Sequence, residues 1–289
     1  MKSLVFSILN VIARSEILWK LYFPFMKIAD YLNTARREHL KSKAKPMPVV
    51  VPPKDPMDVR FESMLGEPVV KSGPFKGMKY PSFTSYGSTM YPKIIGCYEM
   101  EIQSEIARLM KKNYGCILDV GCAEGYYAVG LAMKLPGTKV LAYDIDAGAA
   151  SACRTMAQLN NVSSNVLLAG ACTPTELAEL DTTIKTLIIC DCEGYEKHLF
   201  NTTNVHALAG VDLLIETHDF LDIDISKQIR DLFESSHDIT VIKSVSDIEK
   251  ARSWPYLQQH DLSLQDRKAL FREGRPDTME WLIIESRVK

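Results

Sequence analysis

The sequence predicts an α/β fold built on a mostly parallel sheet with helices on both faces. From residue 114 onward, short apolar segments alternate with segments of helical spacing, which is typical of βαβ units. The apolar segments are rich in Val, Ile and Leu, as are strands buried on both faces. The seven expected strands are 116–120, 139–143, 165–169, 186–190, 211–215, 239–242 and 281–284. The expected helices are 124–135, 147–159, 195–201 and 224–235.

The region before the sheet divides at a proline-rich segment. Five prolines fall between residues 46 and 56, and a helix cannot continue through that density. Beyond them, two short apolar segments flank the turn signal Ser72-Gly73-Pro74, which predicts a hairpin over 69–80. Residues 98–112 have helical spacing. The expected parts are a helical extension (1–45), a linker (46–58) and one folded domain (59–289).

Charge is distributed unevenly along the chain. The formal net charge is −2, but residues 1–60 carry eleven Lys/Arg and five Asp/Glu, a net of +6, which leaves −8 for the remainder. The overall charge argues against a general binder of nucleic acid. We expect amphipathic helices over 3–22 and 25–42 that either lie on an anionic membrane face or pack on the domain or a second subunit. Because Lys2 precedes an apolar run, a signal peptide is the alternative.

Composition and cysteine use indicate a globular intracellular protein. The chain is 46% apolar, 24% charged and 9% aromatic, which excludes a disordered polyelectrolyte. Its seven cysteines are an odd number and form no Cys-x-x-Cys pair, so neither a disulfide framework nor a structural zinc site is expected. We therefore predict a reducing, cytoplasmic location.

The turn after the first strand carries the clearest chemical signal. Asp119-Val120-Gly121-Cys122-Ala123-Glu124-Gly125 follows an apolar strand and precedes a helix. A dinucleotide fingerprint needs a glycine where Ala123 stands, because only glycine lets a pyrophosphate approach the backbone. The carboxylate of Asp119 would also repel phosphate but suits a ligand with an ammonium group. The turn therefore favours S-adenosylmethionine over NAD.

A second acidic residue follows the next strand. Asp144 lies 19 residues beyond Gly125, close to the spacing of about 20 that is typical of a ribose-binding acid. We expect its carboxylate to accept hydrogen bonds from ribose hydroxyls. Asp146 precedes a helical segment, and we expect it to be a helix N-cap.

These motifs resemble the class I S-adenosylmethionine-dependent methyltransferases, which have a doubly wound, Rossmann-like, seven-stranded sheet. Asp191-Cys192-Glu193-Gly194-Tyr195-Glu196, with Glu216 and His218 further on, is similar to the FkbM-like branch, where Val is usual in place of Cys192. The resemblance covers about 97–220. It implies S-adenosylmethionine as the cofactor, and the expected binding residues are Asp119, Gly121, Cys122, Glu124, Gly125, Asp144, Ile145 and Asp191.

The resemblance also implies O-methylation of a sugar, a glycan or another hydroxyl-bearing small molecule. An alcohol must lose a proton during methyl transfer, which favours a positioned base. On pKa grounds His218 is the first candidate, with Asp191 and Glu193 beside it in catalytic roles or holding the cofactor or the acceptor. These three residues would also suit Mg or Mn, although we expect no metal. Glu99 is a further candidate, with a solvated helix face as the alternative. Arg272, Arg275 and Trp281 could shape the acceptor pocket, although we expect Trp281 to pack the last strand.

Two other readings stay open. The basic residues 1–45 could bring the domain to RNA or to a membrane-linked acceptor, although nothing resembling Asn-Pro-Pro-Tyr follows the fourth strand. In the other reading, the protein has the methyltransferase fold and binds a ligand or partner but does not catalyse a reaction. We also consider a homodimer and a peripheral membrane contact through residues 1–45.

Overall fold

The computed structural model describes residues 54–254 and 262–288. The chain divides into two compact units, Met1–Asp55 and Pro56–Lys289, and only the second is described below. The helices expected over 3–22 and 25–42 and most of the expected linker lie outside the described residues. Helix α3 (Pro56–Leu65) begins inside the range expected for the linker.

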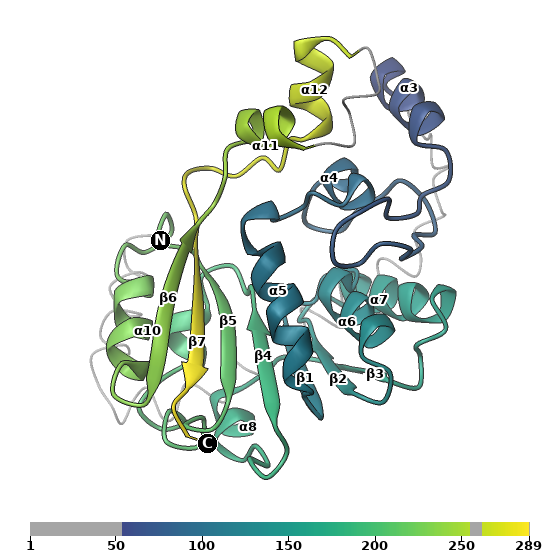
Figure 1. Ribbon diagram of the computed structural model, residues 1–289. Coiled ribbons are helices and arrows are strands. Elements are labelled where there is room, and N and C mark those ends of the chain that lie inside the picture. The colour runs from purple at the N-terminus through teal and green to yellow at the C-terminus, as the bar shows by residue number, and fades with distance from the viewer. Residues whose placement is uncertain (1–53, 255–261, 289) are drawn as a thin grey trace, which may run out of the picture. The chain divides into compact units, whose positions relative to one another are not determined.

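The second unit is organised around a seven-stranded sheet with the order β3-β2-β1-β4-β5-β7-β6 (Figure 1). Strands β1 to β5 are parallel, and β7 is antiparallel to both β5 and β6. The predicted doubly wound, mostly parallel sheet is therefore confirmed. The strands are β1 (Cys116–Val120), β2 (Lys139–Tyr143), β3 (Val166–Ala169), β4 (Thr186–Cys190), β5 (Asp212–Thr217), β6 (His237–Lys243) and β7 (Glu280–Ser286).

The strand order places a ligand-binding crevice at the carboxyl ends of β1 and β4. The chain winds outward in one direction through β2 and β3 and in the other through β4 and β5. In sheets of this kind, ligands bind where the winding direction reverses.

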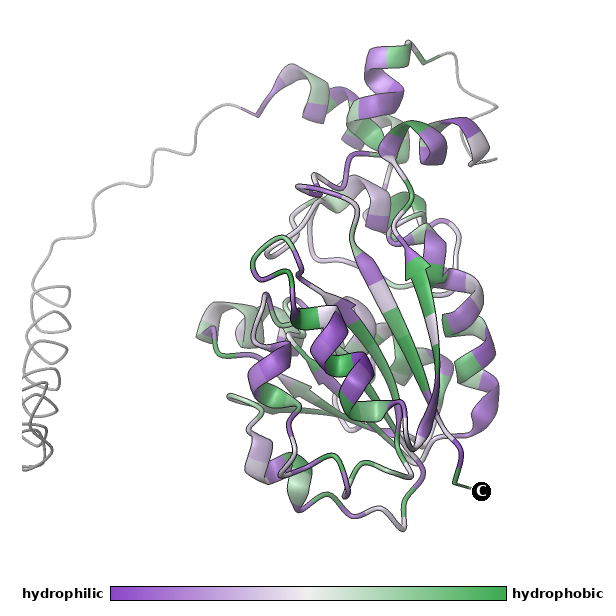
Figure 2. Cartoon of the chain, turned by 90° about the vertical axis from the view of Figure 1, so that its left-hand side faces the viewer, coloured by the Kyte–Doolittle hydropathy of each residue, from purple (hydrophilic) through white to green (hydrophobic). Residues whose placement is uncertain are grey.

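Helices cover both faces of the sheet. Alternate residues of each strand point to opposite faces, so Ile117, Leu187 and Ile189 belong to one apolar cluster and Leu118 and Ile188 to the other. Figure 2 shows these apolar stretches in green along the strands. The longer helices are α5 (Gln103–Leu109), α6 (Tyr126–Lys134), α7 (Ala147–Leu159) and α10 (Ile225–Phe233), and the shorter ones are α4 (Met90–Ile95), α8 (Pro174–Ala178) and α9 (Glu196–Leu199). The 3-10 turns η1 (Met100–Ile102) and η2 (Met110–Lys112) flank α5.

The connection between β6 and β7 forms a helical segment that the sequence did not predict. It contains α11 (Asp247–Ser253) and α12 (Leu264–Leu270). Lys243 at the end of β6 pairs with Glu280 at the start of β7, and Glu280 lies opposite Thr217 at the carboxyl end of β5. The connection therefore starts and ends at the same edge of the sheet as the crevice.

The expected hairpin over 69–80 is reduced to a single antiparallel bridge between Val69 and Lys79. Predicted Asp146 is the N-cap of α7, where its carboxylate accepts hydrogen bonds from the backbone N–H groups of Gly148 and Ala149. All seven cysteines are free thiols.

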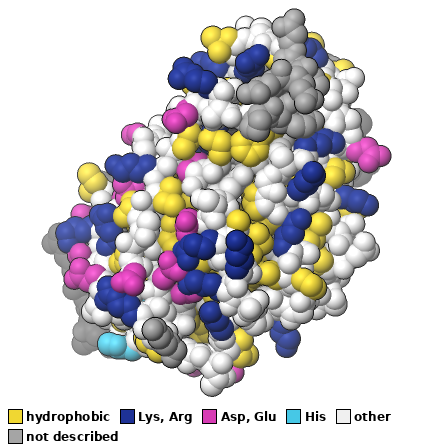
Figure 3. Space-filling view, in the orientation of Figure 1, with side chains coloured by type: hydrophobic (Ala, Val, Ile, Leu, Met, Phe, Trp, Pro, Cys, Tyr) yellow, Lys and Arg dark blue, Asp and Glu magenta, His cyan; other side chains and the backbone are white. Residues whose placement is uncertain are grey.

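Ion pairs cover the face over α5. In Figure 3 dark blue and magenta side chains lie next to one another near the middle of this face. Arg108 and Lys112 both bind Glu285 of β7, at 2.8 and 2.5 Å. In the described part of the chain, every helix is too short or too polar to cross a membrane.

Candidate functional site

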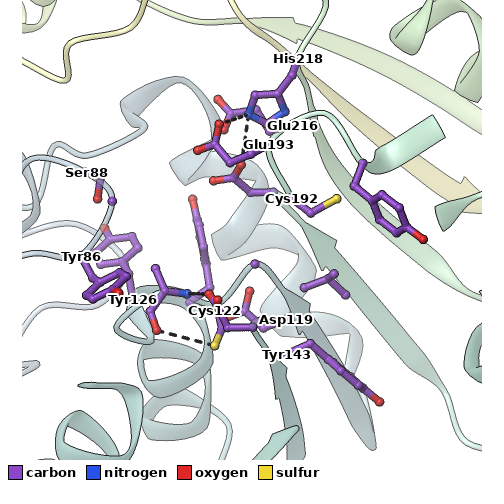
Figure 4. Close-up of a pocket in the computed structure, with 18 of the residues that line it drawn as sticks. Tyr86, Ser88, Asp119, Cys122, Tyr126, Tyr143, Cys192, Glu193, Glu216 and His218 are labelled. Carbon is purple, nitrogen blue, oxygen red and sulfur yellow. Dashed lines mark hydrogen bonds and ion pairs between the residues drawn. The ribbon is translucent and has the colours of Figure 1, made fainter. Parts of the chain in front are cut away.

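A cavity of about 730 Å³ opens at the carboxyl ends of β1, β2, β4 and β5. Of the eight residues expected to hold the cofactor, six line it: Asp119, Gly121, Cys122, Asp144, Ile145 and Asp191. The three expected catalytic residues, Asp191, Glu193 and His218, also line it. Figure 4 shows Glu193, Glu216 and His218 at one end of the cavity and Asp119 with Cys122 toward the other.

The turn after β1 brings its backbone against the loop after β4. Gly121 has a φ of +85°, and a Cβ there would lie 1.7 Å from the carbonyl oxygen of Asp191. Only glycine fits both the left-handed backbone and the contact. Gly125 is the N-cap of α6, also with a left-handed backbone. The two glycines therefore shape the turn, and Gly125 itself does not line the cavity.

Asp119 is a buried carboxyl group with an unsatisfied oxygen. Its residue is 3% exposed, and its Oδ2 atom has no hydrogen-bond partner. Burial raises its pKa to about 7. Leaving such a group unpaired is costly, so the cavity offers it to a ligand that donates hydrogen bonds or carries positive charge.

The acid after β2 is held in place by backbone groups. Asp144 Oδ2 accepts a hydrogen bond from the Ala123 N–H at 3.0 Å, and its Oδ1 accepts one from the Asp146 N–H at 2.8 Å. Each carboxylate oxygen can accept a further bond. The neighbouring Ile145 is 89% exposed, which gives the cavity an apolar platform beside a fixed acceptor.

Glu124 takes a different place from the one expected. Its carboxylate lies 2.5 Å from Lys93 Nζ and accepts hydrogen bonds from Ser85 Oγ and the Tyr86 N–H. Although burial opposes ionisation, the Lys93 ammonium lowers the pKa of Glu124 below its ordinary value. Glu124 is therefore directed at the loop before α4 and does not line the cavity, whereas Tyr86 and Ser88 of that loop do.

His218, the residue that follows β5, is surrounded by three carboxyl groups. Its Nδ1 atom lies 2.8 Å from Glu196 Oε1, and its Nε2 atom lies 3.4 Å from Asp191 Oδ1 and 3.5 Å from Glu193 Oε2. Burial lowers the pKa of His218, but Glu196 and Asp191 outweigh it and raise the value to about 9. Burial raises the pKa of Asp191 to about 7. Asp191, not His218, has the pKa closest to neutrality.

The segment before β7 completes the cavity with an acid and arginine cluster. Arg275 forms an ion pair with Glu216 and lies 3.7 Å from Glu99 and 3.1 Å from Glu273. Glu99, whose φ is 50°, also accepts a hydrogen bond from the Tyr127 hydroxyl. Burial raises the pKa of Glu99 and of Glu216 to about 8. Of the further candidates, Arg275 lines the cavity, and Glu99 lies beside Arg275. Arg272 does not line the cavity, and Trp281 is buried in β7, as expected.

Two sets of side chains in the described residues have ligand atoms close enough to share a cation. One set is Asp191, Glu193 and His218, and the other is Glu99, Asp191 and Glu216. Carboxylate oxygens suit Mg or Mn, and an imidazole donor suits Zn or Fe. The same acids give the cavity a wall that attracts a cationic ligand without a metal.

Comparison with known families adds a finding about the first half of the sheet. Residues 104–186 match the methyltransferase small domain. The matched segment runs from α5 to the first residue of β4 and includes the turn after β1 and the acid after β2. A search of curated proteins gave no significant match.

Solved structures with a similar arrangement are distant. A cofactor-bound protein from MTB is 14% identical, with a TM-score of 0.44, and the match covers 63% of this chain and 79% of that one. The O-methyltransferase TomG from Streptomyces achromogenes, solved with SAM, is 13% identical over 66% and 82% of the two chains, with a TM-score of 0.43. A precorrin-6y C5,15-methyltransferase from Geobacter metallireducens is 13% identical over 64% and 88%, with a TM-score of 0.41. Similarities this distant assign neither activity nor substrate to this chain.

Proposed function

We propose that this chain is an S-adenosylmethionine-dependent methyltransferase that methylates a hydroxyl oxygen. The observation that carries the proposal is the buried, unsatisfied carboxyl of Asp119 in a cavity beside the glycine turn. The match to the methyltransferase small domain covers that turn and supports the proposal.

The residues present fit this cofactor. Asp119 would pair with its ammonium group, and Asp144 would accept hydrogen bonds from its ribose hydroxyls. Ile145 offers apolar surface to the adenine ring. The ionised forms of Asp191 and Glu193 suit the positive charge at sulfur, because opposite charges attract strongly in a partly dehydrated cavity.

The chemistry requires one displacement and one proton transfer. The cofactor supplies a methyl group on a sulfonium centre. The acceptor oxygen forms a bond to the methyl carbon as the carbon–sulfur bond breaks with its electrons on sulfur, and S-adenosylhomocysteine is the second product. The hydroxyl proton passes to Asp191, whose pKa of about 7 suits a base near neutral pH. His218 Nε2 lies 3.4 Å from Asp191 Oδ1, and its positive charge favours the ionised form of Asp191 that must be present before the transfer.

For the acceptor we propose a hydroxyl of a sugar, a glycan or another small metabolite, as in FkbM-like enzymes. The sequence after β4, with Glu193, Gly194 and Glu196 in the expected places, supports this narrower assignment. Acceptors on RNA or a membrane depend on residues 1–45, which lie outside the described residues.

Isothermal titration with S-adenosylmethionine tests the cofactor. We expect binding by the wild type, and an affinity lower by about tenfold or more in Asp144→Ala, because a hydrogen bond to a charged group contributes about 1.5–3 kcal/mol. The control is Asp181→Ala, since Asp181 is exposed, its carboxylate bonds to Thr183, and neither residue lines the cavity. No binding by the wild type, or equal affinity in Asp144→Ala, would contradict the proposal. Release of S-adenosylhomocysteine with a panel of alcohols then identifies the acceptor.

A further inference from the structure

Glu196 is a fully buried carboxylate that reaches the cavity only through another residue. Its side chain is 0% exposed, and it is not among the residues that line the cavity. Its Oε1 atom accepts hydrogen bonds from the backbone N–H groups of Cys192 and Gly194, both at 3.2 Å. The same oxygen lies 2.8 Å from Nδ1 of His218. Glu196 therefore ties the loop after β4 to the residue that follows β5.

The protonation state of Glu196 decides whether the Nδ1 atom of His218 carries a hydrogen. The Oε1 atom of Glu196 already accepts hydrogen bonds from the Cys192 and Gly194 N–H groups, and such bonds favour the ionised carboxylate. An ionised carboxylate only accepts hydrogen bonds. The Nδ1 atom of His218 must therefore carry a hydrogen and donate it to Glu196.

The remaining nitrogen of His218 is the one that faces the reacting groups. Nε2 lies 3.4 Å from Asp191 Oδ1 and 3.5 Å from Glu193 Oε2, beyond the usual N–H···O range of about 2.7–3.2 Å. Asp191 Oδ1 has no hydrogen-bond partner within the described residues. An acceptor hydroxyl placed between these atoms would satisfy both.

We propose that Glu196 is a positioning residue, which fixes the imidazole of His218 through Nδ1 and so presents Nε2 to the acceptor hydroxyl and to Asp191. This inference rests on the proposed methyl transfer, but the arrangement itself exists without cofactor or acceptor. The buried carboxylate fixes the orientation of the ring and, when His218 is neutral, also its tautomer.

Glu196 also contributes to the charge of His218. The groups that face this imidazole are Glu196 from α9, Asp191 and Glu193 from the loop after β4, and Glu216 from β5, which is itself paired with Arg275. Replacing Glu196 by glutamine removes one negative charge at the closest contact. The charged form of His218 then loses stabilisation, and its pKa falls.

Nitrogen-15 NMR of histidine-labelled protein tests the inference without turnover. The chain has six histidines, and the His218 signals are identified by their loss in His218→Asn. In the wild type we expect a hydrogen on Nδ1 of His218 across the folded pH range. In Glu196→Gln we expect the pKa of His218 to fall by at least about one pH unit. The matched control is Asp212→Asn, which neutralises a buried carboxylate bound to Lys112 and Tyr114 and should leave His218 unchanged.

Two results would overturn the inference. One is a wild-type spectrum in which neutral His218 lacks the Nδ1 hydrogen, which needs no variant and so does not depend on Glu196→Gln folding. The other is a folded Glu196→Gln protein whose His218 pKa equals that of the wild type.

Kinetics link the arrangement to methyl transfer. Once an acceptor is identified, we expect Glu196→Gln to lower kcat at least about tenfold and to shift the pH profile toward lower pH, while cofactor affinity stays within about twofold. Glu196→Asp, which keeps the charge, should restore part of the rate. If the wild type does not bind S-adenosylmethionine, the proposed function is contradicted. The NMR measurement on His218 would still test the role of Glu196.

Discussion

Lys93 Nζ lies 2.5 Å from Glu124 Oε1, and neither side chain is more than 4% exposed. This ion pair joins α4 to the turn after β1, across 31 positions of the chain. Glu124 also receives hydrogen bonds from Ser85 and Tyr86. The pair therefore holds the loop that carries Tyr86 and Ser88 over the cofactor side of the cavity.

Lys93→Met should destabilise the protein strongly. Removing one partner of a buried ion pair leaves the other charge uncompensated and typically costs about 3–5 kcal/mol. Urea unfolding measures the loss. The control is Arg60→Met, because Arg60 is 53% exposed in its ion pair with Asp266 and exposed pairs contribute about 0–1 kcal/mol. Equal decreases in the free energy of unfolding of the two variants would show that the burial of the Lys93–Glu124 pair adds nothing to stability.

Gly121→Ala should disrupt the site far more than Gly137→Ala. Both glycines have a left-handed backbone, with φ of +85° and +94°. A Cβ on Gly137 meets nothing within 4 Å, whereas one on Gly121 overlaps the Asp191 carbonyl. Gly137→Ala should cost about 1–2 kcal/mol from backbone strain alone. Gly121→Ala should cost more and weaken cofactor binding at least about tenfold, as thermal unfolding and titration calorimetry would show.

Cofactor affinity should rise with pH through neutrality. Asp119 must be ionised to pair with an ammonium group, and its pKa is raised to about 7. Below that pH the carboxyl is protonated and binding must release the proton, so affinity should rise by up to about tenfold per pH unit and level off above pH 8. Titrations at several pH values measure the slope.

The variants separate the two acids that titrate in this range. Asp119→Asn should bind weakly with a shallower dependence on pH. Asp191→Asn should retain the Asp119 contribution, although the pKa of Asp191 is also about 7. An unchanged slope in Asp119→Asn would contradict the assignment of Asp119 to the ammonium group.

Lys250→Met should loosen the wall of the cavity that comes from the segment before β7. Lys250 is fully buried, forms an ion pair with Glu273 and lies 3.6 Å from Glu101. Without it, these acids face Arg275 alone. We expect faster amide hydrogen exchange over 271–279 and unchanged exchange in β1 and β2, measured by mass spectrometry. The comparison variant is Lys227→Met, because Lys227 forms an exposed ion pair with Asp231 on one helix. Faster exchange over 271–279 in this variant as well would argue against the role of Lys250.

The parallel strands could be predicted closely because their signal is local. Strands β1, β2 and β4 have the bounds expected from their apolar runs, as does α7. Strand β5 extends two residues past its expected end to Thr217, because its polar end pairs with Trp281 and Glu280 of β7. That pairing joins residues more than sixty positions apart, so it leaves no local pattern.

The sequence motifs predicted the residues at the Asp119 end of the cavity better than the ion pairs near β7. Asp119 and Asp144 stand at regular sequence spacings from the glycine turn, so the spacing alone indicates them. The sequence indicated Arg275 but gave no signal for Lys250, because only the folded chain shows the acids around it. Glu124 was misplaced for the same reason, since its partner Lys93 lies outside the motif. Glu196 was visible inside the quoted signature, but its role needs the position of His218.

The antiparallel strand β7 allows the connection between β6 and β7 to change independently of the parallel strands. Because β6 and β7 are adjacent and meet at the crevice edge, the length of chain between them can vary without altering the register of any parallel strand. Loop-closure entropy grows slowly with length, so long replacements are tolerated. Replacing residues 244–279 would then change the cavity wall that carries Glu273 and Arg275 and leave the turn after β1 as it is. This edge is therefore the natural place to redesign that wall of the cavity.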